Sequence, residues 1–227
     1  MNGFNWLEEL SPLVRDAMLA KAKVKALPDG TTISHQGDPA TEVWQIVRGE
    51  IRQCILTEDG QEVLMYIYQP GDLVGDTTVS GGILHSVTLV TKGQVKLRAW
   101  SAKDFSDLKV TYAEIGAAVT EQFSRRLLAV IRILEELLTQ PVAARIASRI
   151  FWLSNMQCVS EQQGMLSISQ ADLGLMVGST RQSVNRVVTE LRNLKLIETV
   201  YGKVMVKDRD GLKRYISEHQ RLARACR

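Results

Sequence analysis

The stretch Ser169–Leu194, SQADLGLMVGSTRQSVNRVVTELRNL, decides the fold of the C-terminal part of this chain. Ser169 predicts the start of a short helix, because its hydroxyl can cap the free N–H groups of an opening turn. Gly178 can supply the left-handed backbone of a helix end, and Ser179 or Thr180 can cap a second helix directly afterwards. Two short helices joined by a turn of about three to four residues are typical of a helix-turn-helix motif.

The second helix of this motif has two unlike faces. Its apolar residues recur at spacings of three and four and are expected to face the core: Val184, Val187, Val188 and Leu191. The opposite face carries residues whose side chains can form paired hydrogen bonds with base edges: Arg181, Gln182, Asn185 and Arg186. A helix that reads DNA is the favoured interpretation, and a solvated helix in a helical hairpin is the alternative.

The chain of 227 residues is long enough for two domains, and its charge is unevenly distributed. Residues 141–227 contain 14 Lys and Arg against 7 Asp and Glu, whereas residues 1–140 contain 14 against 18. The basic excess therefore accompanies the helix-turn-helix, where DNA phosphates would need neutralising. No apolar run approaches the length of a membrane span and no signal peptide is recognisable, so we expect a cytoplasmic protein without a membrane partner.

The three cysteines, Cys54, Cys158 and Cys226, are far apart and form no CxxC pair. This spacing indicates neither a disulfide framework nor a metal site. Ordinary thiols are the favoured interpretation, and a redox role stays open. The chain also lacks a Gly-rich phosphate loop and a Ser/His/Asp set, which argues against an enzyme.

From about Leu27 to Trp100, short runs rich in Val, Ile, Thr and aromatic residues alternate with turn signals. The turn signals are glycines at intervals of about seven to twelve residues: Gly30, Gly37, Gly49, Gly60 and Gly71. This pattern predicts an antiparallel sandwich or barrel, with strands at Val43–Val47 and Val63–Tyr68. A leading helix is expected to begin at Ser11-Pro12.

Between Lys103 and Leu138 the periodicity becomes helical, and the apolar residues form two adjacent stripes. The first stripe, assigned to a dimer interface, consists of Ile115, Val119, Phe123, Val130, Ile133 and Leu137. The second consists of Leu127, Leu128, Ile131, Leu134 and Leu138. One stripe would suffice to cover the barrel, so two stripes favour a helix that also buries surface in a homodimer. A fully buried helix inside one large domain is the alternative.

Thr139, Gln140 and Pro141 form the expected hinge, because proline disfavours helical geometry at the residue before it and cannot continue the hydrogen-bond ladder. A further helix is predicted from Pro141 to Leu153. The hinge lies between the acidic and the basic part of the chain, which makes it a natural place for movement between domains.

After the helix-turn-helix, Leu196–Val200 and Lys203–Val206 flank Tyr201-Gly202 as a small hairpin, so the DNA-binding domain is expected to be winged. Asp208 can cap a final basic helix that ends near Arg224. The predicted fold is therefore α+β. It comprises an effector-sensing antiparallel β-barrel over residues 1–112, a dimerisation helix over 113–140 and a winged helix-turn-helix domain over 141–227.

In this order, barrel, long helix, hinge and winged helix-turn-helix resemble the Crp/Fnr family of bacterial transcription regulators, whose barrel is a cyclic nucleotide-binding-like domain. The resemblance covers nearly the whole chain. Its most specific segments are GDPATEVWQIVRGEIR at 37–52, YQPGDLVGD at 68–76 and ISQADLGLMVGSTRQSVNRVVTELRNLKLIE at 168–198. The resemblance strengthens the winged-helix assignment beyond what residue spacing supports.

In cyclic-AMP-responsive members, the segment equivalent to Gly75–Ser86 holds the sugar and phosphate of the nucleotide. An acidic residue binds the ribose hydroxyl, and an Arg-Ser pair binds the cyclic phosphate. The resemblance carries these roles to Asp76 and Ser86, but His85 stands at the arginine position. A histidine near its reference pKa is mostly neutral at pH 7, so it lacks the permanent charge and paired donors of arginine.

The family's base contacts, a Thr-Ser pair on the long helix, correspond to Val130 and Ile131, which cannot hydrogen-bond adenine. We therefore predict that cyclic AMP is not bound tightly. A less polar effector, or none, stays open. The expected effector pocket comprises Gly75, Asp76, His85, Ser86, Val130 and Ile131.

Other sensors of this family match less well. The oxygen-sensing branch holds an iron–sulfur cluster on N-terminal cysteines, and residues 1–53 contain no cysteine. The carbon-monoxide branch holds a haem with a local Cys/His pair, and His85 has no cysteine beside it. Haem ligation by His85 stays open, while a hydrogen-bonding role is favoured.

Family recognition helices follow an R-E-x-x-x-R arrangement, which Arg181, Gln182 and Arg186 match here. The two arginines resemble guanine readers, and Gln182 replaces a frequent Glu that accepts from cytosine, so the half-site should differ at that base. Phosphate contacts that set the register without reading sequence are expected from Ser169, Thr180, Ser183 and Lys203.

The favoured function is a sequence-specific transcription regulator that acts as a homodimer on a pseudo-palindromic site, with half-sites about one helical turn apart. Its expected partners are double-stranded DNA, a second copy of the chain and RNA polymerase, together with an unidentified effector if one exists. The alternative is a ligand- or haem-binding sensor that acts mainly through protein–protein contacts.

Overall fold

The computed structural model describes residues 5–60, 62–76, 84–156, 165–166, 168–200 and 203–225. The chain divides into two compact units, and the boundary lies inside one long helix, between Leu128 and Ala129. We call the unit that ends at Leu128 the barrel unit, and the unit that continues from Ala129 the DNA-binding unit, after the domain predicted there. Each is described by itself.

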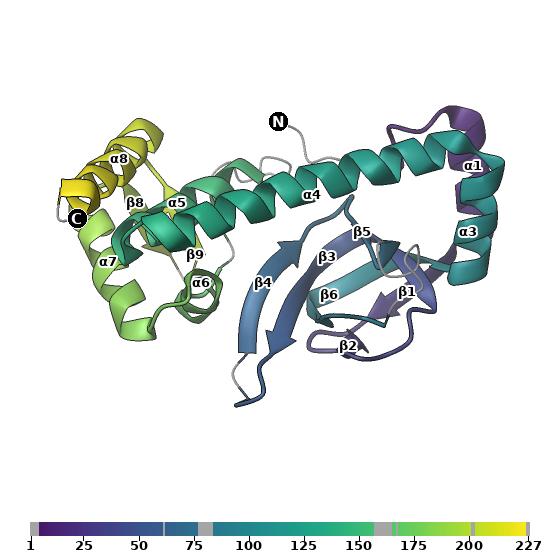
Figure 1. Cartoon of the computed structure of the whole chain (residues 1–227), viewed down its shortest axis with the longest axis horizontal. Coiled ribbons are helices and arrows are strands. Elements are labelled where there is room, and N and C mark those ends of the chain that lie inside the picture. The colour runs from purple at the N-terminus through teal and green to yellow at the C-terminus, as the bar shows by residue number, and fades with distance from the viewer. Residues whose placement is uncertain are drawn as a thin grey trace. The chain divides into compact units, whose positions relative to one another are not determined.

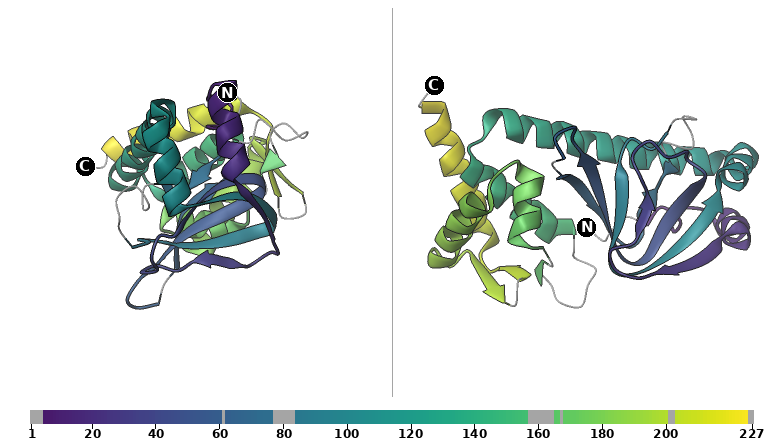
Figure 2. Two further views of the ribbon diagram at one scale, coloured as in Figure 1. Left: turned by 90° about the vertical axis from the view of Figure 1, so that its right-hand side faces the viewer. Right: turned by 90° about the horizontal axis from the view of Figure 1, so that it is seen from below.

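The barrel unit is built around an antiparallel sheet of six strands. Its strands are β1 (Lys23–Leu27), β2 (Thr32–Ser34), β3 (Glu42–Leu56), β4 (Glu62–Tyr68), β5 (Leu73–Val74) and β6 (Thr88–Ser101). The hydrogen-bonded order is β1-β6-β3-β4, with β2 on β6 and β5 on β3. Figure 1 shows the strands side by side, and Figure 2 shows their twist from two further directions. The predicted antiparallel β domain is confirmed as a barrel-like sheet whose described pairings form an open path.

Gly49 does not separate two strands, although the sequence pattern treats it as a turn signal. It lies inside the long strand β3, with a positive φ of 84°. A Cβ at this position would come within 2.5 Å of the Gln94 carbonyl oxygen, so only glycine fits without a backbone shift. The register of β3 on β6 shifts around Gly49, as expected for a β-bulge.

Helices α1 (Pro12–Lys21) and α3 (Ala102–Thr111) pack with the start of α4 (Ala113–Thr139) over an aromatic core. Trp6, Trp100 and Phe105 make ring contacts in this core, with centroids 6.0–6.5 Å apart. Ile115 and Val119 belong to the same cluster and are only 0% and 9% exposed. Their predicted role as dimer contacts is therefore wrong, because the chain's own core already covers them.

Beyond this buried start, α4 presents a large apolar surface. Its exposed apolar residues are Phe123, Leu127, Leu128, Val130, Ile131, Leu134, Leu137 and Leu138. Ile133 is partly buried. The alternative of a fully buried helix is therefore wrong. Helices α3 and α4 are separate because Tyr112 adopts an extended conformation between them.

In the DNA-binding unit, α4 ends at Thr139 and is followed by α5 (Val142–Met156). The predicted break at Gln140-Pro141 is therefore present. Its further elements are β7 (Met165–Leu166), α6 (Gln170–Val177), α7 (Arg181–Asn193), β8 (Ile197–Val200), β9 (Lys203–Val206) and α8 (Arg209–Ala225). The sheet order is β7-β9-β8, so the predicted hairpin is confirmed and gains a third strand. Its turn, Tyr201-Gly202, lies outside the described residues.

Asp208 caps α8 as predicted, because its Oδ1 accepts the backbone N–H of Gly211 at 2.8 Å. A Cβ on Gly211 would meet the same carboxylate at 2.3 Å, so the cap requires glycine there.

Candidate nucleic-acid interface and sensor site

The helix-turn-helix is held by the caps that the sequence predicts. The backbone N–H of Asp172 donates to Ser169 Oγ at 3.0 Å, at the start of α6. Gly178 ends α6 in the left-handed region, with φ 60° and ψ 50°. The N–H of Ser183 then donates to Thr180 Oγ at 3.2 Å, at the start of α7. Both helix starts are thereby fixed by local hydrogen bonds.

The turn between α6 and α7 is also closely packed. A Cβ on Gly174 would lie 2.9 Å from the carbonyl oxygen of Ser179, so α6 can approach the turn because this residue is glycine. On α7 the four valine and leucine residues of the predicted core face are buried: Val184, Val187, Val188 and Leu191. The predicted division of α7 into two faces is confirmed.

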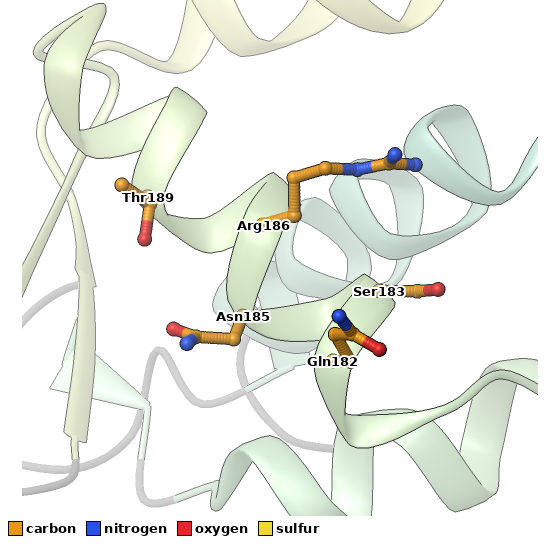
Figure 3. Close-up of a pocket in the computed structure, with 5 residues that line it drawn as sticks. All are labelled: Gln182, Ser183, Asn185, Arg186 and Thr189. Carbon is orange, nitrogen blue, oxygen red and sulfur yellow. The ribbon is translucent and has the colours of Figure 1, made fainter.

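The other face of α7 is polar and open to solvent. The four candidate base readers Arg181, Gln182, Asn185 and Arg186 are all exposed. A hollow on this face is lined by Gln182, Ser183, Asn185, Arg186 and Thr189, whose side chains project from the helix in Figure 3. Thr189 was missed by the sequence reasoning. Its position seven residues after Gln182, two helical turns further along, could have identified it.

Two of the four predicted phosphate contacts already have a local role. Ser169 and Thr180 use their hydroxyl oxygens as helix caps, and the Thr180 hydroxyl donates to Ser183 Oγ at 3.1 Å. Lys203 is exposed at the start of β9. Lys203 therefore offers an exposed positive charge in the wing, whereas Ser169 and Thr180 order the helix starts.

The sensor side contains a buried ion pair. Asp76 is fully buried, and its Oδ1 accepts from Arg126 Nη1 at 3.0 Å. Arg126 also donates to the Leu73 carbonyl, and its guanidinium lies 5.2 Å from the centre of the Tyr68 ring. The candidate acid of the effector pocket is thus bound by an arginine of the same unit.

Gln122, which is also buried, completes the surroundings of Arg126. With its amide oxygen turned towards Arg126, it accepts from Nη2 at 2.6 Å and from the Leu73 N–H at 3.1 Å. Sequence reasoning missed both residues, because single polar residues on a mainly apolar helix give no sign of their partners on the sheet.

His85 is buried and stacks on Trp44, with ring centroids 5.9 Å apart and an interplanar angle of 22°. Burial lowers the pKa of His85, although the nearby Asp38 carboxylate opposes this. The imidazole is therefore neutral at pH 7 and provides no fixed positive charge for a phosphate.

The remaining residues of the predicted pocket lie on separate segments of the two units. Gly75 has a positive φ of 84°, and a Cβ there would lie 2.9 Å from the Glu42 carbonyl. Ser86 is exposed. Val130 and Ile131 belong to the other unit and are each about half exposed. Residues 77–83 of the pocket segment lie outside the described residues.

Within the described ranges, no three His, Cys, Asp or Glu side chains are grouped so that they could hold a metal ion. Cys54 is buried, and its thiol donates to Glu62 Oε1 at 2.9 Å. Cys158 and Cys226 lie outside the described residues. None of the described helices has the length and apolar character needed to cross a membrane.

Comparison with known proteins gives matches for both units. Residues 24–112 match the cyclic nucleotide-binding domain, and residues 144–215 match the Crp-like helix-turn-helix domain. The cAMP-activated global transcriptional regulator CRP of Pasteurella multocida is 27% identical over 191 residues, which cover 83% of this chain and 91% of that protein.

Solved structures show the same fold. FixK2 from Bradyrhizobium japonicum aligns with a TM-score of 0.77 at 18% identity, over 86% of this chain and 96% of that one. The c-di-GMP responsive global regulator CLP of Xanthomonas campestris aligns with a TM-score of 0.74 at 24% identity, over 86% and 99%. Both domain models, in the family's order, and a relative spanning most of the chain agree: the protein belongs to the Crp/Fnr family of transcription regulators.

Proposed function

We propose that this protein binds a pseudo-palindromic DNA site as a homodimer and reads each half-site with α7. The observation that carries this proposal is the exposed row of Arg181, Gln182, Asn185 and Arg186 on a helix whose other face is buried. Such a helix can enter the major groove, where these side chain types pair with base edges. As a member of a family of transcription regulators, the protein is expected to act with RNA polymerase.

The base preference follows from the chemistry of the exposed row. Arg181 and Arg186 can each donate two hydrogen bonds to guanine, whereas Gln182 and Asn185 can pair with adenine. Gln182 is the most distinctive of the four, because related recognition helices frequently carry Glu, which accepts from cytosine. A preference for adenine over cytosine is therefore expected opposite Gln182.

Binding-site selection from random DNA tests this reading. Gln182→Glu should change the selected base at one position of each half-site and leave the others unchanged. Gln94→Glu makes the same chemical change at an exposed position of the barrel unit and should leave the selected site unchanged. An identical half-site for the wild type and Gln182→Glu would remove Gln182 from the list of readers.

The salt dependence of binding separates this function from a sensor that acts through protein–protein contacts. Each phosphate contact releases counterions, so the affinity of a DNA reader must fall steeply as the salt concentration rises. Lys203→Gln should reduce the slope of log affinity against log salt concentration by about one, which is the contribution of one phosphate contact. A nearly salt-independent association with DNA would favour the sensor function instead.

We assign the dimer contact to the apolar face of α4, where a second copy of the chain would pack. On this helix, exposed apolar residues recur at alternating spacings of four and three: Phe123, Leu127, Val130, Leu134 and Leu137. This is the heptad pattern of a two-helix seam, whose supercoil keeps the apolar stripe against a partner helix. The seam replaces the predicted stripe, which included the buried Ile115 and Val119.

Two aspartates in the seam test dimerisation. Val130→Asp with Leu134→Asp should give a monomer in sedimentation experiments, and the monomer should lose affinity for the full site in a gel-shift assay. Arg125→Asp with Leu128→Asp changes two exposed residues at heptad positions outside the seam and should leave the dimer intact. A seam variant that stays dimeric, or binds DNA as tightly as the wild type, would contradict this assignment.

We further infer that cyclic AMP does not control this protein, although the Pasteurella relative is named as cAMP-activated. Three observations support this: His85 is neutral, Asp76 already binds Arg126, and Val130 and Ile131 offer no hydrogen bond to a base. Losing a charged, paired phosphate contact weakens binding by about a few kcal/mol. Calorimetric titration should therefore show no sub-micromolar binding of cyclic AMP. The same titration tests candidate effectors of other classes.

A further inference from the structure

The corner between α4 and α5 contains a buried pair of opposite charges that no DNA contact explains. Glu136 lies on the last turns of α4 and Arg149 lies in the middle of α5, with Arg149 Nη2 3.8 Å from Glu136 Oε2. The side chains are only 5% exposed for Arg149 and 11% for Glu136. Arg132 approaches the other carboxylate oxygen from the surface, at 3.6 Å, with its side chain 65% exposed.

The surroundings of the pair do not fully satisfy its charges. The Arg149 guanidinium lies 5.6 Å from the centre of the Trp152 ring, and its buried Nε has no hydrogen-bond partner among the described residues. A small cavity beside the pair is lined by Ala129, Arg132, Ile133, Glu136, Arg149 and Trp152. Burial raises the pKa of Glu136 and lowers that of Arg149, so burial disfavours the charged form of both side chains.

This corner determines where the recognition helix lies relative to the end of α4. Only Gln140 and Pro141 separate α4 from α5, so the chain leaves little length for adjustment. Helix α5 packs on α6, α7 and α8, and it buries Ile146 and Ile150. A change of angle at the corner would therefore move the helix-turn-helix as a block.

Two backbone hydrogen bonds next to the corner each stay within one helix. The N–H of Gln140 donates to the Glu136 carbonyl at 3.0 Å, which belongs to the end of α4, and the N–H of Arg145 donates to the Pro141 carbonyl at 3.0 Å, which belongs to the start of α5. A side-chain bond from Ser148 Oγ to Gln140 Oε1 is long, at 3.4 Å. The Glu136–Arg149 pair joins the two helices by an attraction between opposite charges.

We propose that Arg149 is a positioning residue that, by binding Glu136, fixes the angle between α4 and α5 and so selects the spacing of half-sites that the dimer accepts. The proposal rests on the proposed function, because it requires a dimer whose α4 helices form the axis. A buried ion pair is poor at adding stability but well suited to specifying one geometry. Arg149 touches no base and acts through α5.

The test measures the affinity for three DNA duplexes that carry the same selected half-sites. Their half-site spacing is the selected one, one base pair longer, or one base pair shorter. The wild type should bind the selected spacing at least about tenfold more tightly than the others, since one base pair moves the half-site along and around the duplex. Arg149→Met should reduce this ratio to about twofold or less, with the loss mainly on the selected spacing. Arg149→Lys, which keeps the charge, should retain most of the ratio.

Glu136→Gln should reproduce the loss of spacing preference, and the exchange of Glu136→Arg with Arg149→Glu should restore it in part. Arg132→Met is the matched control, because it removes an exposed arginine from the same carboxylate, and it should leave the ratio unchanged. Circular dichroism and sedimentation check that every variant is a folded dimer. If Arg149→Met does not fold, Glu136→Gln and the exchange variant decide the result.

A folded dimer of Arg149→Met or Glu136→Gln that keeps the wild-type spacing preference overturns the positioning role and leaves the proposed function intact. A wild-type protein that is monomeric, or binds single half-sites as tightly as full sites, overturns the proposed function instead. Rescue by the exchange variant supports the pairwise contact, since a merely structural role of either residue would not recover with reversed charges.

Discussion

Two buried ion pairs involve α4, one in each unit, and they differ in how fully their charges are satisfied. In the barrel unit, Arg126 donates to Asp76 at 3.0 Å, donates to the Leu73 carbonyl and lies over the Tyr68 ring. In the DNA-binding unit, Arg149 lies 3.8 Å from Glu136, which is beyond hydrogen-bond distance. The first pair is a hydrogen-bonded network, and the second is a charge contact beside a small cavity.

The pKa shifts show the consequence of this difference. Burial lowers the pKa of Arg126, but Tyr68, Asp76 and Asp72 outweigh it, so the net pKa is raised. Burial also lowers the pKa of Arg149, and Glu136 does not compensate. We therefore expect the barrel pair to contribute more to the stability of its unit than the corner pair contributes to the other unit. Both pairs are buried, so burial by itself does not determine what an ion pair contributes.

The largest effect is expected from Arg126→Met. The substitution leaves Asp76 buried without a cation, which destabilises the barrel unit by about 3–5 kcal/mol. Urea unfolding followed by tryptophan emission measures it, since Trp6, Trp44 and Trp100 lie in that unit. Arg125→Met, at the adjacent exposed position, should change stability by less than about 0.5 kcal/mol. A loss below about 1 kcal/mol for Arg126→Met would remove the contrast between the two pairs.

A smaller effect of opposite sign is expected from Asp72→Asn. Burial raises the pKa of Asp72 to about 6, so its ionised form is disfavoured in the folded state. The wild type should therefore lose stability as the pH rises from about 4 to about 6, and the variant should be free of this loss. The amide oxygen can still accept the Gln69 N–H.

Unfolding measured at several pH values tests this expectation. Asp72→Asn should be more stable than the wild type by about 1–3 kcal/mol at pH 7.5, and by close to nothing at pH 3.5. A gain that is the same at both values would mean that the charge of Asp72 is not its cause.

Glu136→Gln tests the second ion pair, at the corner between α4 and α5. Burial raises the pKa of Glu136, which favours a neutral side chain here, whereas the substitution also leaves Arg149 without its anion. These effects oppose each other, so the free energy of unfolding at pH 7.5 should change by at most about 1 kcal/mol. Any gain should disappear at acidic pH, where the wild-type carboxyl is protonated too. A loss of several kcal/mol in thermal or urea unfolding would make the corner pair an anchor like the Arg126 pair.

The smallest effect is expected from Arg132→Met. Its contact with Glu136 is 3.6 Å long and its side chain is mostly exposed, so solvent screens the attraction. Stability should change by less than about 0.5 kcal/mol, and raising the salt concentration should abolish the difference. A larger loss would assign part of the corner's rigidity to the surface arginine instead of Arg149.

Features that depend on neighbours in the sequence were predictable. The caps of α6 and α7, the left-handed Gly178 and the two faces of α7 follow from spacings of three and four residues within one segment. The break between α4 and α5 at Pro141 follows from the covalent structure of proline. The predicted hairpin of β8 and β9 follows likewise from a short stretch, whereas β7, which pairs with β9 from a distant segment, was missed.

Features that depend on distant contacts were not predictable in the same way. Ile115 and Val119 continue the apolar stripe of α4, and no property of that stripe shows that its first turns are covered by Trp100 and Phe105. Arg126 stands among apolar residues at an ordinary helix position, and its partner Asp76 lies on a separate segment.

The sequence by itself determined the helix-turn-helix, the wing hairpin, the helix break at Gln140-Pro141 and the polar face of α7, because capping, turn chemistry and helical periodicity act between residues close in the chain. The tertiary structure alone decided which part of α4 is core and which part is exposed. It also decided that Asp76 is bound by Arg126 and that Arg149 reaches Glu136. These outcomes depend on the packing of remote segments, where burial and the distance between charges set the energies.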